Sequence, residues 1–365
     1  MKINILLPFK EKFDLNDASS VSTTIRNNMK HSKYINDITV YGKNVKNPIY
    51  LENFVGITPK KFLFLNKNKF LAKQMVLKIL NNKNDRQLVE IHNRPYLFKF
   101  LHNSLKKFPI SIFFHNNPLD MNGAKKIEQR QYMVDNAAAI FCVSKFIRSK
   151  FLEGLDQNKD NVHVLYNGVE RELKKFPRKS KKVLFVGKIL PEKGVHIFCE
   201  AVSQINKIYP NWDFGIIGSG LEKKRKYSFS NLILENFKSL GSNTHLMGLL
   251  SNEKVQCEMK NSSIIVVPSI WQEPFGLVVN EAMSNGAAVI ASKVGGIPEI
   301  LKTNGILIEE INVKNLKDAI EYLIKHPKQL DRYQKLSWKN FELSAKTSSK
   351  ELDNFRNQII KKYFS

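Results

Sequence analysis

Residues 263–292 read SIIVVPSIWQEPFGLVVNEAMSNGAAVIAS and contain a complete strand, helix and strand. The β-branched run at 263–269 predicts a buried strand, and AAVIAS at 287–292 predicts another. Between them, the amphipathic stretch 276–285 has the length and spacing of a helix. Because two apolar strands joined through a helix form the repeating unit of a parallel sheet, this segment predicts an α/β fold.

Strands and helices alternate in the same way over nearly the whole chain. The other predicted strands are 2–9, 37–42, 87–92, 110–115, 138–144, 162–168, 182–187, 213–218, 244–250 and 305–310. The other predicted helices lie near 17–31, 68–81, 95–107, 124–135, 145–153, 194–208, 222–239, 251–260, 313–325 and 328–340. This order is typical of doubly wound, Rossmann-like sheets.

A charged stretch interrupts the alternation after residue 169. Residues 170–182, ERELKKFPRKSKK, are polar and contain Pro177, which predicts a linker between domains. We therefore expect two Rossmann-like domains, over residues 1–170 and 181–345. Residues 346–365 have a basic amphipathic pattern with too narrow an apolar stripe for a separate domain, so we expect this helix to pack back on the first domain.

The composition is that of a globular protein with a large positive charge. Of 365 residues, 42% are hydrophobic and 25% are charged, which excludes collagen-like and low-complexity chains. The 58 basic residues exceed the 33 acidic ones by 25, which favours an anionic partner: nucleic acid, a membrane surface or a phosphorylated substrate. A codon bias towards Lys and Asn explains the excess equally well.

The apolar runs and the cysteines indicate the compartment. No run approaches the length of a membrane-spanning helix, and the N-terminal run shows no secretory cleavage site, so we expect a cytoplasmic protein. Cys142, Cys199 and Cys257 are far apart, which predicts neither a disulfide framework nor a zinc site. Each cysteine is expected to be a small buried residue.

Two glutamates mark a candidate binding loop within residues 268–292. Glu273 and Glu281 lie eight residues apart, and Pro274 fits a first helical turn, where backbone N–H groups lack partners. The N–H groups that would be open to an anion or a sugar hydroxyl are those of Phe275, Gly276 and Leu277. Glu281 could accept paired hydrogen bonds from sugar hydroxyls. Taken alone, either glutamate is better explained by the helix dipole or by solvation.

A second candidate loop is LFVGKILPEKGVHIF, residues 184–198. Lys188 and Lys193 follow a buried strand and converge on the start of the next helix, which suits a pyrophosphate. The P-loop pattern is absent. An ordinary strand–helix loop with surface lysines is an equally good explanation of this segment alone.

Taken together, these segments resemble glycosyltransferase family 4, whose members are retaining nucleotide-sugar transferases with the GT-B fold. The resemblance covers most of the chain and rests on GKILPEKG (187–194), IIGSG (216–220), EPFGLVVNE (273–281), ASKVGGIPEI (291–300), VSKFIRSKF (143–151) and LYNGVE (165–170). The segments HNRP (92–95) and HNNPL (115–119) are similar to those of enzymes that assemble lipopolysaccharide core or capsule.

The resemblance implies a role for each matching residue. Lys188 and Lys193 would neutralise the donor diphosphate, and Glu281 would bind the ribose. Glu273, with the backbone of residues 275–277, would hold the hexose. The base would be read at Gly248 and Leu249, and His115 matches a family histidine that faces the donor sugar from the first domain. The residues implied to be catalytic are His115, Glu273 and Lys193.

The loop after the first strand departs from the family pattern, which has paired glycines there. Here the small residues are Ala18, Ser19 and Ser20, at the head of a predicted helix, and they could form the acceptor or phosphate loop. Asn16 or Asp17 would cap that helix.

The resemblance implies metal-independent, retaining hexosyl transfer without a cofactor. The fixed lysines and a helix N-terminus would stabilise the departing diphosphate, and the leaving phosphate itself would take the acceptor proton. The donor would be a UDP- or GDP-linked hexose, and the acceptor a saccharide or glycolipid of a surface polysaccharide or lipopolysaccharide.

The basic surface leaves further partners open. Segments 59–80 and 97–108 mix Phe and Leu with Lys, as expected for contact with an anionic membrane on its inner face, although ordinary surface helices have this pattern too. No specific nucleic-acid partner is predicted, because no RNP, KH or helix-turn-helix pattern is present. The alternatives are a basic nucleic-acid or membrane-binding protein without transferase activity, and a nucleotide-sugar epimerase of the same fold.

Overall fold

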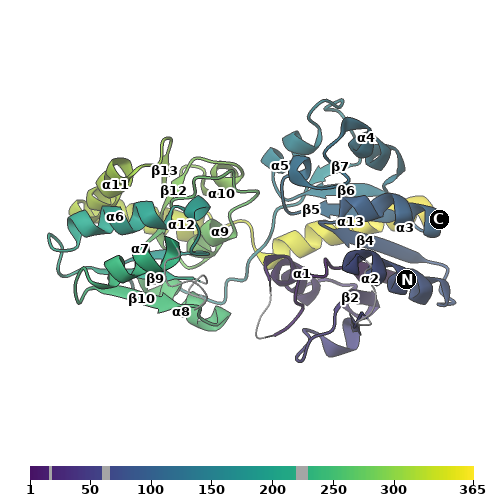
Figure 1. Cartoon of the computed structure of the whole chain (residues 1–365), viewed down its shortest axis with the longest axis horizontal. Helices are drawn as coiled ribbons and strands as arrows, with labels where there is room; N and C mark the ends of the chain where they lie inside the picture. Colours follow the sequence, from purple (N-terminus) through teal and green to yellow (C-terminus); the bar gives the residue numbers. More distant parts are fainter. Residues whose placement is uncertain (16–18, 60–65, 219–228) are drawn as a thin grey trace. The chain divides into compact units, whose positions relative to one another are not determined.

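The structure, a computed structural model, describes residues 1–15, 19–59, 66–218 and 229–365. It divides into two compact units: residues 1–168 with 345–365, and residues 169–344 (Figure 1). Each unit is a parallel β-sheet with helices packed on it, which confirms the predicted α/β class with two Rossmann-like sheets.

The first unit has a parallel sheet in the order β3-β2-β1-β4-β5-β6-β7. Its strands are β1 (Lys2–Leu6), β2 (Ile38–Lys43), β3 (Phe54–Ile57), β4 (Gln87–His92), β5 (Ile110–Phe114), β6 (Ala139–Cys142) and β7 (Val162–Val164). Its helices are α1 (Ser20–Lys30), α2 (Lys67–Leu80), α3 (Phe98–Ser104), α4 (Ile127–Asn136), α5 (Lys145–Phe151) and α13 (Ala345–Phe364), with 3-10 turns η1 (Ile35–Asp37), η2 (Leu51–Asn53), η3 (Pro95–Leu97) and η4 (Pro118–Asp120). Strand β3 was not predicted.

Helices α1 and α13 lie side by side on one face of this sheet (Figure 1). Leu352 and Ile359 of α13 are buried in the core formed by β1, β4 and β6. An ion pair lies beside this apolar contact. The guanidinium of Arg356 donates two hydrogen bonds of 2.8 Å to the carboxylate of Glu90 on β4, and another of 3.1 Å to Asp353.

Water scarcely reaches this ion pair, because the side chains of Arg356 and Glu90 are only 3% and 2% exposed. Ser32, in the loop after α1, donates to Asp353, so the second carboxylate is also satisfied. Charges this deeply buried are tolerated only when they are paired and hydrogen-bonded. The network therefore ties the last helix to a central strand and to the loop after α1.

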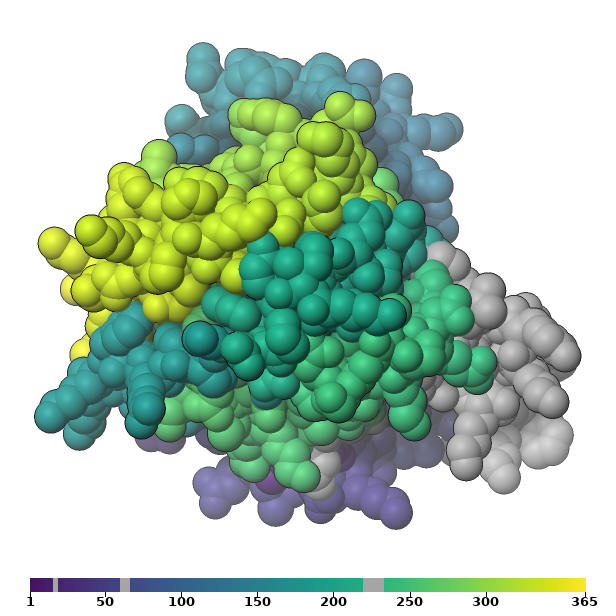
Figure 2. Space-filling view, turned by 90° about the vertical axis from the view of Figure 1, so that its left-hand side faces the viewer, coloured from purple at the N-terminus to yellow at the C-terminus, as the bar shows by residue number. Residues whose placement is uncertain are grey.

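The second unit has a parallel sheet in the order β10-β9-β8-β11-β12-β13. Its strands are β8 (Ser180–Val186), β9 (Asp213–Ile217), β10 (Thr244–Gly248), β11 (Ser262–Val267), β12 (Ala288–Ser292) and β13 (Ile306–Ile308). Its helices are α6 (Val195–Ile205), α7 (Phe229–Lys238), α8 (Asn252–Asn261), α9 (Leu277–Ser284), α10 (Ile297–Leu301), α11 (Val313–Lys325) and α12 (Pro327–Lys339), with the 3-10 turn η5 (Pro191–Lys193). Helices α6 and α11 pack side by side on the face that Figure 2 shows.

The prediction of a linker over residues 170–182 is wrong, because this segment is anchored in the second unit. The Arg171 guanidinium lies 4.1 Å from the centre of the Trp338 ring and donates to the Trp338 carbonyl oxygen at 2.7 Å. Lys179 Nζ donates to the carbonyl oxygens of Lys260 and Asn285, both at 2.8 Å, near the ends of α8 and α9. The Trp338 ring thus compensates the charge of Arg171, and carbonyl oxygens at the ends of two helices compensate the charge of Lys179.

The cysteines are free thiols, and two of the three are buried. Burial raises the pKa of Cys142, and it raises the pKa of Cys199 to about 12. Cys257 is exposed on α8, so its predicted burial is wrong; Met259 is the residue of α8 that is buried. In the described part of the chain, no helix is both long and apolar enough to cross a membrane.

Replacing Arg356 by methionine leaves the carboxylates of Glu90 and Asp353 buried without their counter-charge. We expect the free energy of unfolding to fall by about 3–5 kcal/mol, measured by chemical denaturation. As a control, Lys150→Met removes an exposed ion pair with Glu153 and should lower it by less than about 1 kcal/mol. Equal losses in the two variants would contradict a stabilising role for the buried network.

Candidate functional site

The two predicted binding loops begin on neighbouring strands of the second sheet. Strand β8 lies between β9 and β11, so the strand order reverses there, and ligands of such sheets bind beside the carboxyl ends at this point. The loop after β8 and the loop after β11 are in backbone contact. The Ile270 N–H donates to the Glu192 carbonyl at 2.9 Å, and a Cβ on Gly194, which has φ +69°, would lie 1.9 Å from the Pro268 carbonyl oxygen.

The contact between these loops brings together Lys193 and Glu273. Lys193 Nζ lies 2.6 Å from Glu273 Oε1, and Ser269 Oγ donates to the same oxygen at 2.6 Å. The side chains of Lys193 and Glu273 are 23% and 10% exposed, so the pair is mostly shielded from water but still open on one side. Lys193 Nζ also lies 5.1 Å from the centre of the Trp271 ring.

The backbone of Glu273 is held by the segment after β12. The Gly296 N–H donates to the Glu273 carbonyl at 2.8 Å, and the Gly295 N–H donates to Gln272 Oε1 at 2.8 Å. A Cβ on Gly295, which has φ +55°, would lie 2.0 Å from that carbonyl oxygen. The paired glycines of ASKVGGIPEI therefore allow a close backbone contact that positions the glutamate.

Helix α9 begins later than predicted. It starts at Leu277, with Gly276 at its N-cap in the left-handed region (φ +103°), so Pro274 lies in the loop and not in a first helical turn. The left-handed Gly276 redirects the chain, and the helical bonds begin with the Val279 N–H donating to the Gly276 carbonyl at 3.0 Å. Phe275 is buried, whereas Leu277 and Glu281 on α9 are half-buried.

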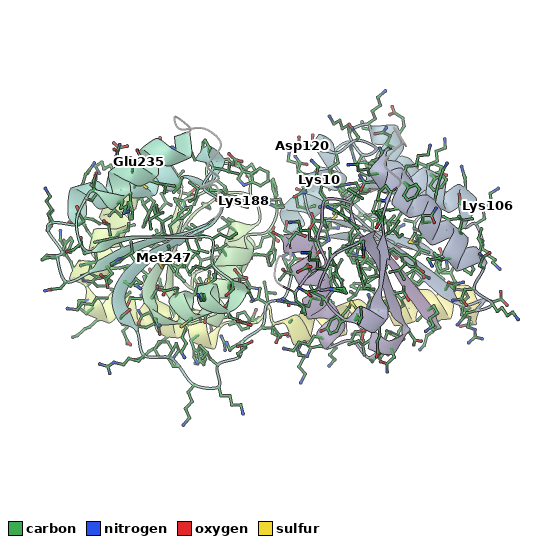
Figure 3. All side chains as sticks on the ribbon, turned by 60° about the horizontal axis from the view of Figure 1, so that its bottom comes forward. Lys10, Lys106, Asp120, Lys188, Glu235 and Met247 are labelled. Carbon is green, nitrogen blue, oxygen red and sulfur yellow. The ribbon has the colours of Figure 1, made fainter. Side chains whose placement is uncertain are left out.

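The remaining predicted donor-site residues also lie at the carboxyl edge of this sheet. Lys188 is exposed on the loop after β8 (Figure 3), and it forms no ion pair within the described residues. Gly248 ends β10 with φ +65°, and its carbonyl accepts from the Gly218 N–H at 2.9 Å. Leu249 follows with its side chain 77% exposed. Residues 219 and 220 of the IIGSG segment lie outside the described residues.

In the first unit, His115 follows β5 and lies beside His92, the last residue of β4. Their rings are joined by a contact of 2.9 Å between His92 Nδ1 and His115 Nε2. The His115 N–H donates to Asn93 Oδ1 at 2.8 Å, and Asn93 has a positive φ of 52°. Burial lowers the pKa of both imidazoles, that of His115 to about 4, so both rings are neutral at pH 7.

The predicted acceptor loop is described only in part. Ser19 is the N-cap of α1, and its hydroxyl donates to the carboxylate of Glu11 in the loop after β1; Ser20 is the first residue of the helix. Ala18 lies outside the described residues, as do the predicted caps Asn16 and Asp17. Lys10 and Asp120, which follow β1 and β5, lie at this carboxyl edge, and Figure 3 shows Lys106 at the opposite end of the unit.

Two residues at these sites carry no sequence-based role: Ser269 and His92. His92 ends β4, and Ser269 lies two residues beyond β11, as Lys188 does beyond β8. This position at the carboxyl end of a buried strand is the signal that could have identified them. Within the described residues, no three His, Cys, Asp or Glu side chains are placed to hold a metal ion.

Comparison with known proteins gives two matching family models that together cover most of the chain. "Glycosyl transferases group 1" matches residues 169–338, and "Glycosyltransferase Family 4" matches residues 36–173. An uncharacterized glycosyltransferase of Methanocaldococcus jannaschii is 36% identical over 200 residues; the match covers 54% of this chain, and the chain spans only about half (52%) of that relative. A lipopolysaccharide 1,2-N-acetylglucosaminetransferase of Salmonella typhimurium is 26% identical, over 56% of this chain and 60% of its own.

Solved structures share the fold over nearly the full length. The Anabaena protein HepE, in complex with UDP and glucose, superposes with a TM-score of 0.76 and 18% identity over 98% of this chain and 99% of its own. Sucrose-phosphate synthase of Thermosynechococcus elongatus has the same TM-score, 0.76, with 16% identity over 99% of each chain. At such identities the likeness shows the fold, two Rossmann-like domains of GT-B type.

The buried imidazoles should make the first unit sensitive to acid. The pKa of His115 is about 4 in the native state and about 6.5 when unfolded, so between these values the unfolded chain binds a proton that the native state does not. We expect the free energy of unfolding to fall as pH drops through this window, by up to about 1.4 kcal/mol per pH unit for each imidazole. Urea denaturation near pH 7 and near pH 5 measures this difference in the free energy of unfolding. The difference should be smaller in His115→Gln than in the wild type. An equal difference in the two proteins would refute a contribution of His115 to the acid sensitivity.

Proposed function

Because the chain belongs to the group 1 and family 4 glycosyltransferases, we propose that it transfers a hexose from a nucleotide-diphosphate sugar to a saccharide or lipid-linked acceptor, with retention of configuration. The observation that carries the proposal is the Lys193–Glu273 pair at the point where the strand order of the second sheet reverses. The Lys193 ammonium can bind a phosphate, and the adjacent Glu273 carboxylate can accept hydrogen bonds from sugar hydroxyls, so the pair suits a sugar diphosphate.

Each residue at that edge receives one task in the proposed reaction. Lys188 and Lys193 neutralise the diphosphate, Glu281 accepts from the ribose hydroxyls, and Glu273 accepts from the hexose. The backbone of Phe275, Gly276 and Leu277 also contacts the hexose, and Gly248 with Leu249 lies against the base. In the first unit, His115 is the proposed catalytic residue, and the segment at Ser19 and Ser20 is assigned to the acceptor.

The proposed chemistry needs neither a metal nor a protein base. The bond from the anomeric carbon to the β-phosphate oxygen breaks, and the bond to the acceptor oxygen forms on the same face of the sugar. The acceptor proton passes to the departing phosphate oxygen, so charge and atoms balance. The ammonium groups of Lys188 and Lys193 stabilise the negative charge that develops on the diphosphate.

The names of similar proteins support the choice of donor and pathway. HepE was solved with UDP and with UDP-glucose, which supports a uridine donor, although GDP sugars remain the alternative to be tested. A relative that acts in lipopolysaccharide synthesis supports a role in surface polysaccharide assembly.

We also propose that the first unit touches an anionic membrane at its inner face, where a lipid-linked acceptor would be found. On the outer side of α2, Leu77 and Leu80 are exposed, and so are Lys73 and Lys78. Apolar and cationic side chains on one surface favour binding to anionic lipid. The preceding residues 60–65 lie outside the described residues.

Nucleotide binding tests the donor site directly. UDP, GDP and ADP, each alone and as hexose conjugates, are screened for a rise in melting temperature, and the binding nucleotide is titrated calorimetrically. We expect Lys193→Ala and Glu281→Ala to weaken binding by about 10–100-fold, because each loses charge-assisted hydrogen bonds. Lys314→Ala, which removes an exposed lysine of α11, is the control and should bind normally. A protein that no nucleotide stabilises would refute the proposal.

Co-sedimentation with vesicles tests the membrane contact. Binding should rise with the fraction of anionic lipid, and the double variant Leu77→Glu with Leu80→Glu should weaken it several-fold. Leu51→Glu, at another exposed leucine of the first unit, should leave binding unchanged. The membrane contact would be refuted if the fraction of protein bound to vesicles did not depend on anionic lipid, or if Leu51→Glu lowered it as much as the double variant does.

A further inference from the structure

The His92 imidazole is buried behind His115, in the interior of the first unit. It is 4% exposed and stacks on the Phe113 ring, with 4.3 Å between ring centres and 11° between planes. Its Nδ1 lies 2.9 Å from His115 Nε2. The backbone N–H of His115 donates to Asn93 Oδ1, so residues at the end of β4 restrain both the ring and the backbone of His115.

Two neutral imidazoles in this contact share a single proton. If the proton is on His92 Nδ1, then His115 must carry its own proton on Nδ1 and present a donor. If it is on His115 Nε2, then His115 Nδ1 is bare and presents an acceptor. The far nitrogens of the two rings are therefore opposite in kind: when one is a donor, the other is an acceptor.

The side chain of His92 lines a small cavity whose walls are mostly apolar. Neither His92 Nε2 nor Asn28 Oδ1 has a hydrogen-bond partner among the described residues, and both side chains line a cavity of about 10 Å³. That volume holds about one water molecule, which could bond to both atoms at once. The backbone of Asn28 is held in place because the Ser349 hydroxyl of α13 donates to the Asn28 backbone carbonyl at 2.7 Å.

We propose that His92 is a positioning residue, which fixes the ring orientation and the tautomer of His115 through the shared proton. A buried water between His92 Nε2 and Asn28 Oδ1 would supply a hydrogen-bond partner to both atoms, and the shared proton couples the tautomers of the two rings. The proposal deepens the proposed function and rests on it in one respect: His115 is the residue that acts on the substrate.

The pairing itself is tested by nitrogen-15 NMR of histidine-labelled protein, which distinguishes protonated from bare ring nitrogens. In the native protein, one of the two facing nitrogens should be protonated and the other bare, with each ring in one tautomer. His92→Phe keeps the stack on Phe113 but removes the nitrogen, so His115 should become a mixture of tautomers. A charged ring, or an unchanged His115 tautomer in His92→Phe, would overturn the proposal whatever the activity.

The consequence for transfer is tested by steady-state kinetics. His92→Phe should lower kcat by about 10–100-fold, as expected for a residue that orients a reacting group, with the KM for the donor within about threefold of wild type. His92→Asn places an amide near the position of Nδ1 and should recover most of this loss. Equal losses in both variants, or a rise in KM alone, would overturn the proposal.

The two proposals can fail separately. If the wild type transfers no sugar although the NMR pattern is as expected, the proposed function fails while the histidine pair stands. If transfer occurs but the pattern is absent, only the positioning role fails. The wild-type NMR measurement needs no variant, so a charged ring or two protonated facing nitrogens there would overturn the proposal even if His92→Phe does not fold.

Discussion

The guanidinium of Arg356 lies in the interior of the first unit, where it is paired with the carboxylates of Glu90 and Asp353. Much of that unit depends on this buried ion-pair network. Glu90 is two residues from His92 on β4, so the ion pair and the histidine pair share one strand and one of its faces. Aromatic rings connect them as well: Phe355, beside Arg356, packs on Phe141, which packs on Phe113 under His92. The last helix thus supports the residues at the end of β4.

In the second unit, close backbone contacts position the loops at the carboxyl edge of the sheet. Its loops meet backbone to backbone, at Gly194 against Pro268 and at Gly295 against Glu273, where a side chain would not fit. The Lys193–Glu273 contact then compensates two charges before any ligand arrives. A sugar diphosphate entering this edge would meet groups already aligned, and it would exchange the lysine's contact with a carboxylate for one with phosphate.

Local sequence patterns were enough to predict the α/β class, most strands and the positions of the loops after β8 and β11. Runs such as 263–269 and 287–292 are buried on both faces, and such strands are apolar throughout. What failed depends on contacts between distant residues. In the sequence, Arg171 and Lys179 have the pattern of solvated residues, because their partners, the Trp338 ring and two helix ends, are distant in the chain. Strand β3 was missed because it is short and only weakly apolar. The roles of His92 and Ser269 likewise arise from partners that the sequence does not place beside them.

The first unit is interrupted in sequence: α13 follows the whole of residues 169–344 but belongs with residues 1–168. During synthesis, the sheet that carries His92 and His115 therefore emerges from the ribosome long before the helix that covers one of its faces. After Glu90 is made, 265 further residues are added before Arg356, its ion-pair partner, is made. The strands and helices of the second unit are all made before Arg356. The second unit can thus be completed before the first, and the face of the first sheet that carries Glu90 is covered only after α13 has been made.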